Sequence, residues 1–397
     1  MEKKFSQVCV KASNSNYQNL IKREQDFGEK LDVRSPFERD YTRIIHSTAY
    51  RRLKHKTQVF YNVESDHVCT RMEHVLHVES VSYTIAKNLG LNEELTKAIA
   101  TGHDLGHAPF GHYGEKIISD LYKTYVDSSF WHERNGLYFA DDIELLPDEN
   151  NACKNLNLTY AVRDGIISHC GEQDLNVLMP RSEFIDLKNF DRKGKFSPIT
   201  FEGCVVKISD KIAYVGRDIE DALTLKFLKE ENIKELANLL GVDGAVNTTN
   251  IMSNLIQDVI ENSSPNKGIA MSEKASEMLN KIKAFNYKYV YDNKKFEPFK
   301  NYAKLIITEL FNLFAELYDG ENTLENIKSK INVYGDNVNG FYDYVIKYAK
   351  DVESKYVFNK KIYDLTDKKS FYSAVLDYIS GMTDKFAVSS FTKLITY

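Results

Sequence analysis

The stretch NEELTKAIATGHDLGHAPFGHYGE, residues 92–115, joins an apolar helix to a turn-rich loop that carries polar side chains. Asn92 is a typical N-cap, and the two acids after it suit the positive end of a helix dipole. Apolar residues follow at helical spacing and lead the chain to His103-Asp104. The next segment, 105–115, holds three glycines and one proline, so we expect a loop before a new helix at about Glu115.

Helices are also predicted on both sides of this stretch. Residues 70–89 have a broad apolar side and end at Gly90, a residue suited to a helix C′ position. Helical spacing predicts further helices over 40–56, 160–169, 201–228 and 301–318. With only 19 glycines and 7 prolines in 397 residues, turns and helix breakers are scarce. The sequence therefore predicts an all-α fold with few or no short strands.

The chain divides by composition into three parts. Residues 1–35 form a polar lead segment that we expect to be loosely ordered. Residues 36–230 hold the histidine-rich helices and are predicted to form a catalytic core. Beyond about residue 230 the composition shifts toward Lys, Asn and Tyr, which predicts a helical C-terminal region, 231–397, packed on that core.

Composition and charge exclude several classes of protein. Hydrophobic residues make up 43% of the chain and charged residues 27%, so the chain can bury a core and is not a disordered tail. The balance of 52 Lys+Arg against 57 Asp+Glu gives a net charge of −5, which argues against a protein that coats DNA. The five cysteines lack CxxC spacing, and no apolar run suits a signal peptide or a membrane span. We therefore expect a cytoplasmic protein with no membrane partner.

A group of polar residues has the composition of a metal site. Six of the ten histidines lie between residues 67 and 112. His74 lies on the apolar side of its helix, where a buried imidazole needs a partner. His103-Asp104 lies at a helix end, and Asp210 lies in an apolar helix where an unpaired carboxylate is costly. This mixed nitrogen and oxygen set suits Mn, Fe, Ni, Co or Mg better than a structural zinc.

Further polar residues indicate a bound anion and proton transfer. Asp210, Tyr214 and Asp218 share one helix face, and Lys211 beside them could reach a phosphate oxygen. In the basic segments, Arg52 and Arg71 are the expected anion ligands, because a guanidinium binds phosphate in a bidentate manner.

Two histidines are candidates for acid–base catalysis. His112 and Glu115 are spaced H-x-x-E, so the carboxylate can orient the imidazole and raise its basicity. His132-Glu133 could form a second acid–base pair.

Six blocks of the sequence, in this order, resemble the HD-domain superfamily and, within it, the dGTPase-like deoxynucleoside triphosphate triphosphohydrolases. The blocks are RSPFERDYTRIIHSTAYRRLKHKTQVF (34–60), TRMEHVLHVE (70–79), GHDLGHAPFGHYGE (102–115), AVRDGIISHCGE (161–172), FEGCVVKISDKIAYVGRDIEDA (201–222) and LDYISGMTDKFA (376–387). The resemblance implies a mainly α-helical HD-domain fold. It also implies metal-dependent hydrolysis of dNTPs, dGTP or several of them, to the deoxynucleoside and inorganic triphosphate.

The resemblance implies a role for individual residues. The metal ligands would be His74, His103, Asp104 and Asp210, which hold one divalent ion per active site. The catalytic pair would be His112 and Glu115, and the phosphate contacts would be Arg71, His107, His132 and Lys211. Tyr214 would lie beside the sugar and the scissile phosphate, Asp218 would accept a hydrogen bond from the 3′-OH, and Gln58 and Val59 would line the sugar and base. Water would attack the α-phosphorus, with His112 or His132 assisting proton transfer at the 5′-oxygen.

Other interpretations remain open. The order His74, His103-Asp104, His132, His169, Asp210 could form the binuclear site of a phosphodiesterase or nucleotidase. The same fold could also serve as a catalytically silent nucleotide sensor. Single-stranded DNA binding by the Tyr-rich C-terminal region is a secondary expectation. The resemblance further implies a homo-oligomer, a tetramer or hexamer, and leaves an allosteric dNTP possible.

Overall fold

A computed structural model describes residues 3–27, 33–61, 67–148, 151–169, 176–241, 246–350, 352–353 and 360–396 of the chain. Helices dominate it. The strands in these ranges form two short antiparallel pairs, β1 (Leu146–Pro147) with β2 (Cys153–Lys154) and β3 (Val177–Leu178) with β4 (Ile269–Ala270). The predicted all-α fold class is confirmed.

The chain forms two compact units that alternate along the sequence. The first unit holds Met1–Ile45, Gln58–Asp104 and Asn157–Glu297, and the second holds His46–Thr57, Leu105–Leu156 and Pro298–Tyr397. The division into a lead segment, a core of residues 36–230 and a C-terminal region of residues 231–397 stays a prediction.

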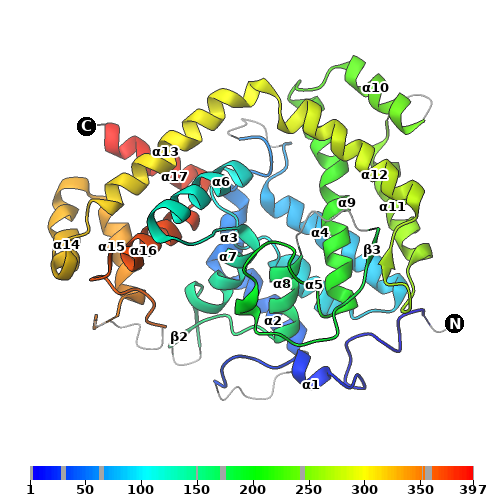
Figure 1. Cartoon of the computed structure of the whole chain (residues 1–397), viewed down its shortest axis with the longest axis horizontal. Helices are drawn as coiled ribbons and strands as arrows, with labels where there is room; N and C mark the ends of the chain where they lie inside the picture. The colour runs from blue at the N-terminus through cyan, green and yellow to red at the C-terminus, as the bar shows by residue number, and fades with distance from the viewer. Residues whose placement is uncertain are drawn as a thin grey trace. The chain divides into compact units, whose positions relative to one another are not determined.

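In the first unit, helices α4, α5, α8 and α9 pack against one another (Figure 1). Helices α11 and α12 add to this group through contacts with α9. With each helix assigned to the unit that holds most of it, the helices here are α1 (Tyr17–Leu20), α2 (Pro36–His46), α4 (Arg71–Leu89), α5 (Glu93–Gly102), α8 (Tyr160–Ser168), α9 (Phe201–Thr224), α10 (Glu230–Leu240), α11 (Thr248–Asn262) and α12 (Glu273–Asn286).

Local signals fix the ends of the helices that carry polar residues. Thr70 and Glu73 form a capping box at the start of α4, and Gly90, predicted as the residue that ends this helix, has φ +84°. The Asn92 side chain accepts the Leu95 N–H and caps α5, which ends immediately before His103. These caps fix where α4 begins and where α5 ends. His74 therefore lies in the first turns of α4, and His103 directly follows α5.

The described part of the lead segment is packed onto the first unit rather than loosely ordered. Phe5 is fully buried, and its N–H donates to the Leu89 carbonyl at 2.8 Å. Arg23 pairs with the buried Asp40 at 2.6 Å. The expectation of a loose lead was wrong because its few apolar side chains and its backbone groups find buried partners, which outweigh its polar composition.

In the second unit, α16 packs against α6 and α15, and α14 packs against α15 (Figure 1). The helices of this unit are α3 (Thr48–Arg52), α6 (Gly111–Leu121), α7 (His132–Tyr138), α13 (Glu297–Ala315), α14 (Thr323–Tyr334), α15 (Asp336–Tyr348), α16 (Lys368–Ser380) and α17 (Asp384–Ile395). π-Helical turns follow α6 at Tyr122–Val126 and α7 at Phe139–Ile143.

Several predicted helix boundaries were wrong, among them the end of the helix expected over 201–228, which lies at Thr224. The helix expected over 40–56 is interrupted at Ser47, which is buried and whose side chain accepts the Tyr50 N–H to start α3. The helix expected from about Glu115 begins at Gly111, because Phe110 and Gly111, both at positive φ, complete the turn earlier. As a result, Glu115 lies in the body of α6.

Two observations concern membrane spans and cysteines. Among the described residues, none of the helices has the length and hydropathy needed to cross a bilayer. Cys9, Cys69, Cys153 and Cys204 are free thiols, whereas Cys170 lies outside the described residues.

Candidate active site

The first unit brings together two overlapping groups of potential metal ligands. One group is His74 on α4 with His103 and Asp210, and the other is His103, Asp104 and His169. Within each group the ligand atoms all lie within 4.8 Å of one another. The four ligands predicted from sequence therefore converge, and His169, just after α8, joins them.

His103 and His169 each use Nδ1 for a hydrogen bond to a backbone carbonyl, so Nε2 of each ring is not used in that bond. His103 Nδ1 donates to the Ala100 carbonyl at 2.6 Å, and His169 Nδ1 donates to the Ile166 carbonyl at 2.7 Å. Each Nε2 then carries the lone pair, the tautomer of a metal-binding imidazole. His103 Nε2 is buried without a hydrogen-bond partner among the described residues, 3.5 Å from Asp104 Oδ1 and 4.0 Å from Asp210 Oδ1. A buried acceptor facing two carboxylates fits a divalent cation between them.

The charge state of Asp210 also suits a cation. Burial raises the pKa of this carboxyl, but the hydrogen bond and charge of His74 and the nearby His103 outweigh burial and lower it. For His74, burial lowers the pKa, but the 3.0 Å hydrogen bond to Asp210 and the charges of Asp210 and Asp104 together outweigh burial and raise it. Asp210 is therefore ionised at neutral pH, and a bound cation would replace the proton of His74.

Arg71, a predicted phosphate ligand, is buried and pairs with a predicted metal ligand. Its Nη1 donates to Asp104 Oδ2 at 2.7 Å, and its Nη2 to the Gln58 carbonyl at 3.4 Å. Asp104 therefore has one oxygen toward the guanidinium and the other toward His103. Gln58 and Val59 are half-buried.

The predicted face of α9 continues from the metal ligand Asp210 along the helix. Lys211 and Tyr214 are half-buried, and Asp218 is buried. The Tyr291 hydroxyl donates to Asp218 Oδ2 at 2.5 Å. Burial raises the pKa of Asp218 to about 7, although the bond from Tyr291 opposes this shift. The carboxyl expected to bind a sugar hydroxyl thus already faces a phenol.

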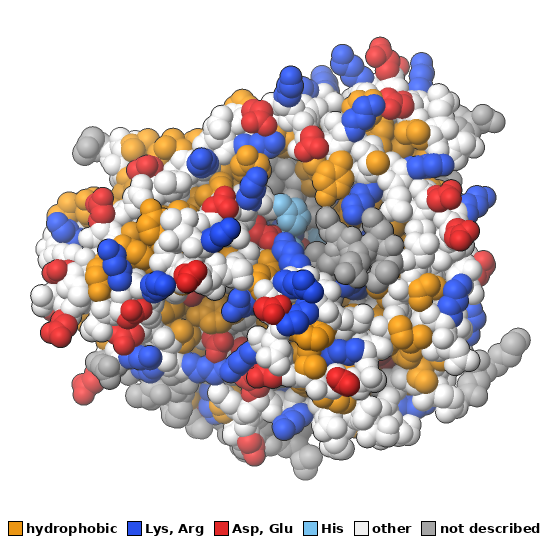
Figure 2. Space-filling view, in the orientation of Figure 1, with side chains coloured by type: hydrophobic (Ala, Val, Ile, Leu, Met, Phe, Trp, Pro, Cys, Tyr) orange, Lys and Arg blue, Asp and Glu red, His pale blue; other side chains and the backbone are white. Residues whose placement is uncertain are grey.

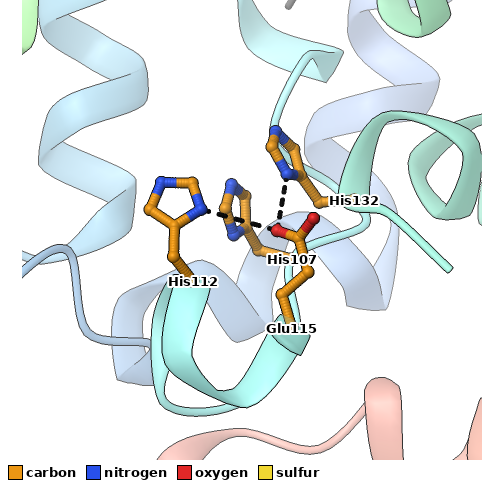
Figure 3. A group of neighbouring side chains, drawn as sticks. All are labelled: His107, His112, Glu115 and His132. Atoms are coloured by element: carbon orange, nitrogen blue, oxygen red, sulfur yellow. Dashed lines mark hydrogen bonds and ion pairs between the residues drawn. The ribbon is translucent and has the colours of Figure 1, made fainter. Parts of the chain in front are cut away.

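The second unit holds a separate group of three histidines around Glu115 (Figure 3). Glu115 Oε2 lies 2.8 Å from His132 Nδ1 and 3.5 Å from His112 Nδ1. The ring of His107 stacks on that of His132, with centroids 3.9 Å apart. Helix α6 supplies His112 and Glu115, and α7 begins with His132.

The pairing within this group differs from the two predicted pairs. Glu115 is closer to His132 than to His112, and Glu133 lies 3.4 Å from the same His132 nitrogen. Burial raises the pKa of Glu115, but the charge of His132 and the hydrogen bonds of both histidines lower it well below its usual range. Glu115 is therefore an anion that links two histidines, and 73% of the His112 side chain is exposed against 4% of that of His132.

Arg52, the other predicted substrate cation, is engaged in the second unit. Its Nη2 lies 2.8 Å from Glu144 Oε1, and Glu144 is almost fully buried. Glu144 also accepts the backbone N–H and the hydroxyl of Thr48 at 2.7 Å. The arginine thus neutralises a buried carboxylate, a structural role that competes with binding a phosphate.

Two residues of the site were not among the predicted site residues. His169 appears in the sequence as one member of the binuclear pattern, and its place after an apolar helix was the available signal. Tyr291, in the π-helical turn Tyr287–Tyr291, carries no local motif, so only the fold reveals its bond to Asp218.

Comparison with known sequences agrees with this geometry. The family profile described as HD domain matches residues 71–215, which include all five residues of the potential metal site. A second profile, described as phosphohydrolase-associated domain, matches residues 269–335.

Curated relatives match over most of their length. A deoxyguanosinetriphosphate triphosphohydrolase-like protein of Caldanaerobacter subterraneus subsp. tengcongensis is 36% identical over 367 residues, 92% of this chain and 86% of that protein. Proteins described in the same words from Clostridium tetani and Pelagibacter ubique are 32% and 31% identical, and the matches cover 94% of this chain and 88% and 98% of those proteins.

Proposed function

Because the chain carries an HD domain and belongs to the family of deoxyguanosinetriphosphate triphosphohydrolase-like proteins, we propose that it hydrolyses deoxynucleoside triphosphates. The products are the deoxynucleoside and inorganic triphosphate. The observation that carries this proposal is the buried His103 Nε2, which faces Asp104 and Asp210 beside His74. Such a donor set suits a divalent ion that works on phosphates.

His74, His103, Asp104 and Asp210 would hold one divalent metal, with Mn, Mg, Fe, Co and Ni as candidates. When bound, the metal supplies positive charge that polarises a phosphoryl group and lowers the pKa of water. Arg71 would orient Asp104, since its guanidinium donates a hydrogen bond to one carboxylate oxygen. Lys211, one residue after Asp210 on α9, would stabilise negative charge on a phosphate oxygen.

The group around Glu115 would supply proton transfer in this proposal. Water attacks the α-phosphorus, the bond to the 5′-oxygen breaks, and that oxygen takes up a proton. We assign the donation of this proton to His112, because its exposed imidazole can exchange protons with solvent. Glu115 orients His112 and His132 through its single Oε2 atom, and the stacked His107 and His132 are left to bind phosphate.

Discrimination between sugars is assigned to α9. Tyr214 would pack against C2′ of the sugar, leaving no space for a ribose hydroxyl. Asp218 would accept the 3′-OH, and the Tyr291 hydroxyl already bonded to it shows that this carboxylate accepts such a donor. Equal turnover of GTP and dGTP would contradict the role of Tyr214.

Product analysis tests the reaction. The chain is incubated with Mn²⁺ or Mg²⁺ and each dNTP, alone and mixed, and the products are separated by chromatography. We expect a deoxynucleoside and triphosphate, and their loss in His103→Ala. Activity only in mixtures would indicate an allosteric dNTP, and release of a deoxynucleoside monophosphate would contradict the proposal.

One observation favours a second candidate, a binuclear phosphodiesterase or nucleotidase. His169 lies beside His103, with ring centroids 5.0 Å apart, and forms its own potential ligand group with Asp104. A metal count near two per chain would support this candidate, whereas a count near one supports the triphosphohydrolase. A silent sensor would bind dNTPs without releasing any product.

The remaining predictions concern partners. Figure 2 shows Lys and Arg side chains interspersed with Asp and Glu on one face, so single-stranded DNA binding stays a secondary prediction. Its test is strongly salt-dependent retention on immobilised DNA. A tetrameric or hexameric assembly and a cytoplasmic location are proposed with the family, and sedimentation analysis tests the former.

A further inference from the structure

Three residues near the C-terminus are buried against the elements that carry the group around Glu115. Asp377 and Ser380 lie on the last turns of α16, and Asp384 begins α17. None of the three is more than 6% exposed. We call these three residues the C-terminal clamp, because each one contacts a different part of the loop and helices around Glu115.

Asp384 holds the backbone that starts α6. Its Oδ1 accepts the Phe110 N–H at 2.8 Å, and its Oδ2 accepts the Thr57 N–H at 2.9 Å. Phe110 is the N-cap of α6 and has φ +64°, a left-handed conformation that is uncommon for a residue with a Cβ. A buried carboxylate therefore supports a strained position two residues before His112, across 274 positions of sequence.

Asp377 holds the other end of α6 and the end of α7. It accepts the hydroxyl of Tyr122, the residue directly after α6, and that of Tyr138, the last residue of α7, the latter at 3.1 Å. The Tyr363 hydroxyl is a third donor, at 2.7 Å. One carboxylate thus joins both helices that bear the Glu115–His132 bond.

Ser380 completes the clamp on the loop that carries His107. Its carbonyl accepts from the buried Lys56 ammonium at 3.3 Å, and the same ammonium donates to the His107 carbonyl. Its hydroxyl accepts from Asn135 Nδ2 at 3.4 Å, and that amide also donates to the Gly106 carbonyl at 2.8 Å. The loop between α5 and α6 is therefore bonded to the clamp through two side chains.

We propose that the C-terminal clamp positions Glu115 against His132, so that Asp377 and Asp384 are positioning residues of the proposed reaction. The 2.8 Å bond between Glu115 and His132 joins α6 to α7, so its length depends on how these helices are held. The clamp fixes both ends of α6 and the C-terminal end of α7. A displacement of about 1 Å in such a pair can cost on the order of a hundredfold in rate.

The first test compares Asp384→Asn with a matched control, Asp336→Asn. Both aspartates are the first residue of a helix, but Asp336 is exposed and pairs with Lys393 at 2.7 Å. In the full chain, we expect Asp384→Asn to raise amide hydrogen exchange over 105–115 by about 10- to 100-fold, as loss of a charged hydrogen bond implies. We expect kcat to fall by a similar factor, with KM and metal content near the wild-type values, and Asp336→Asn to change none of these.

A milder second pair keeps the proposal testable if Asp384→Asn folds poorly. Tyr122→Phe removes only the hydroxyl bonded to Asp377, whereas Tyr344→Phe removes a hydroxyl of the same cluster that bonds Tyr363 instead. We expect lower kcat and faster exchange over 116–138 for Tyr122→Phe than for Tyr344→Phe.

The inference rests on the proposed function, and its failure can be told apart from failure of that function. Faster exchange with unchanged kcat would overturn the positioning role and leave the clamp as a structural contact. Equal exchange in a variant and its control would overturn the clamp altogether. If the wild-type chain hydrolyses no dNTP, the proposed function fails, and exchange over 132–138 alone decides whether the clamp holds α7.

Discussion

Gly106→Ala should disturb the group around Glu115 and leave the potential metal ligands unchanged. A Cβ at Gly106 would lie 2.0 Å from the backbone nitrogen of Gly136 and 2.2 Å from the carbonyl oxygen of His132. Ordinary van der Waals contact requires about 3.4 Å, so α7 must move away by about 1.4 Å. The Glu115–His132 bond, 2.8 Å in the wild type, cannot survive a shift of that size unaltered.

We expect kcat/KM for dNTP hydrolysis to fall on the order of a hundredfold in Gly106→Ala. Overpacking should also destabilise the fold by about 1–3 kcal/mol, measured by urea unfolding. The metal bound by His74, His103, Asp104 and Asp210 should not be lost, because these proposed ligands lie in the first unit. The control is Gly381→Ala in the same unit, where the nearest atom to a new Cβ is 3.4 Å away. Wild-type kcat/KM in a folded Gly106→Ala would refute the role of α7 in the reaction.

Three further predictions concern charge and metal. Glu115→Gln should lower kcat about 10²- to 10⁴-fold with metal content unchanged, because the amide cannot orient two histidines; a steady-state assay showing less than a fivefold loss would be inconsistent with the assignment. Removing divalent ions with a chelator should abolish activity, and Mn²⁺ at a hundredfold excess over Kd should restore it and add about 2.7 kcal/mol of stability. An identical melting temperature with and without Mn²⁺ would argue against the site. Burial raises the pKa of Asp377 from 3.8 to about 6, so its contribution to stability is complete below about pH 4 and is lost as the pH rises through 6. Asp377→Asn should therefore remove up to about 3 kcal/mol of the stability change between pH 4 and 7 in urea titrations, and an unchanged pH profile would count against it.

Much of the first unit followed from local rules. The range predicted for α4, with Gly90 after it, agrees with the structure, because helix ends depend on a few neighbouring residues. The convergence of His74, His103, Asp104 and Asp210 was also predictable, since buried imidazoles and carboxylates on apolar helices need partners. His169 was harder to assign, because its approach to His103 depends on how α8 packs.

The interactions of the second unit were less predictable. Sequence spacing suggested that Glu115 serves His112, whereas the fold brings it closer to His132, seventeen positions away. Arg52 was expected to bind substrate, but the buried Glu144 that it neutralises is distant in sequence. The Asp384–Phe110 bond carries no sequence signal at all, because side chain to backbone contacts between distant segments leave no periodic pattern.

The central claim is water attack at the α-phosphorus of a dNTP, and a hydrolysis run in ¹⁸O-labelled water tests it most directly. The chain, loaded with Mn²⁺, is incubated with dGTP and the other dNTPs, and the ¹⁸O content of each product is measured by mass spectrometry. We predict ¹⁸O in the inorganic triphosphate and none in the deoxynucleoside, with both products absent for His103→Ala. Label in the deoxynucleoside, or release of pyrophosphate or phosphate instead of triphosphate, would contradict the account.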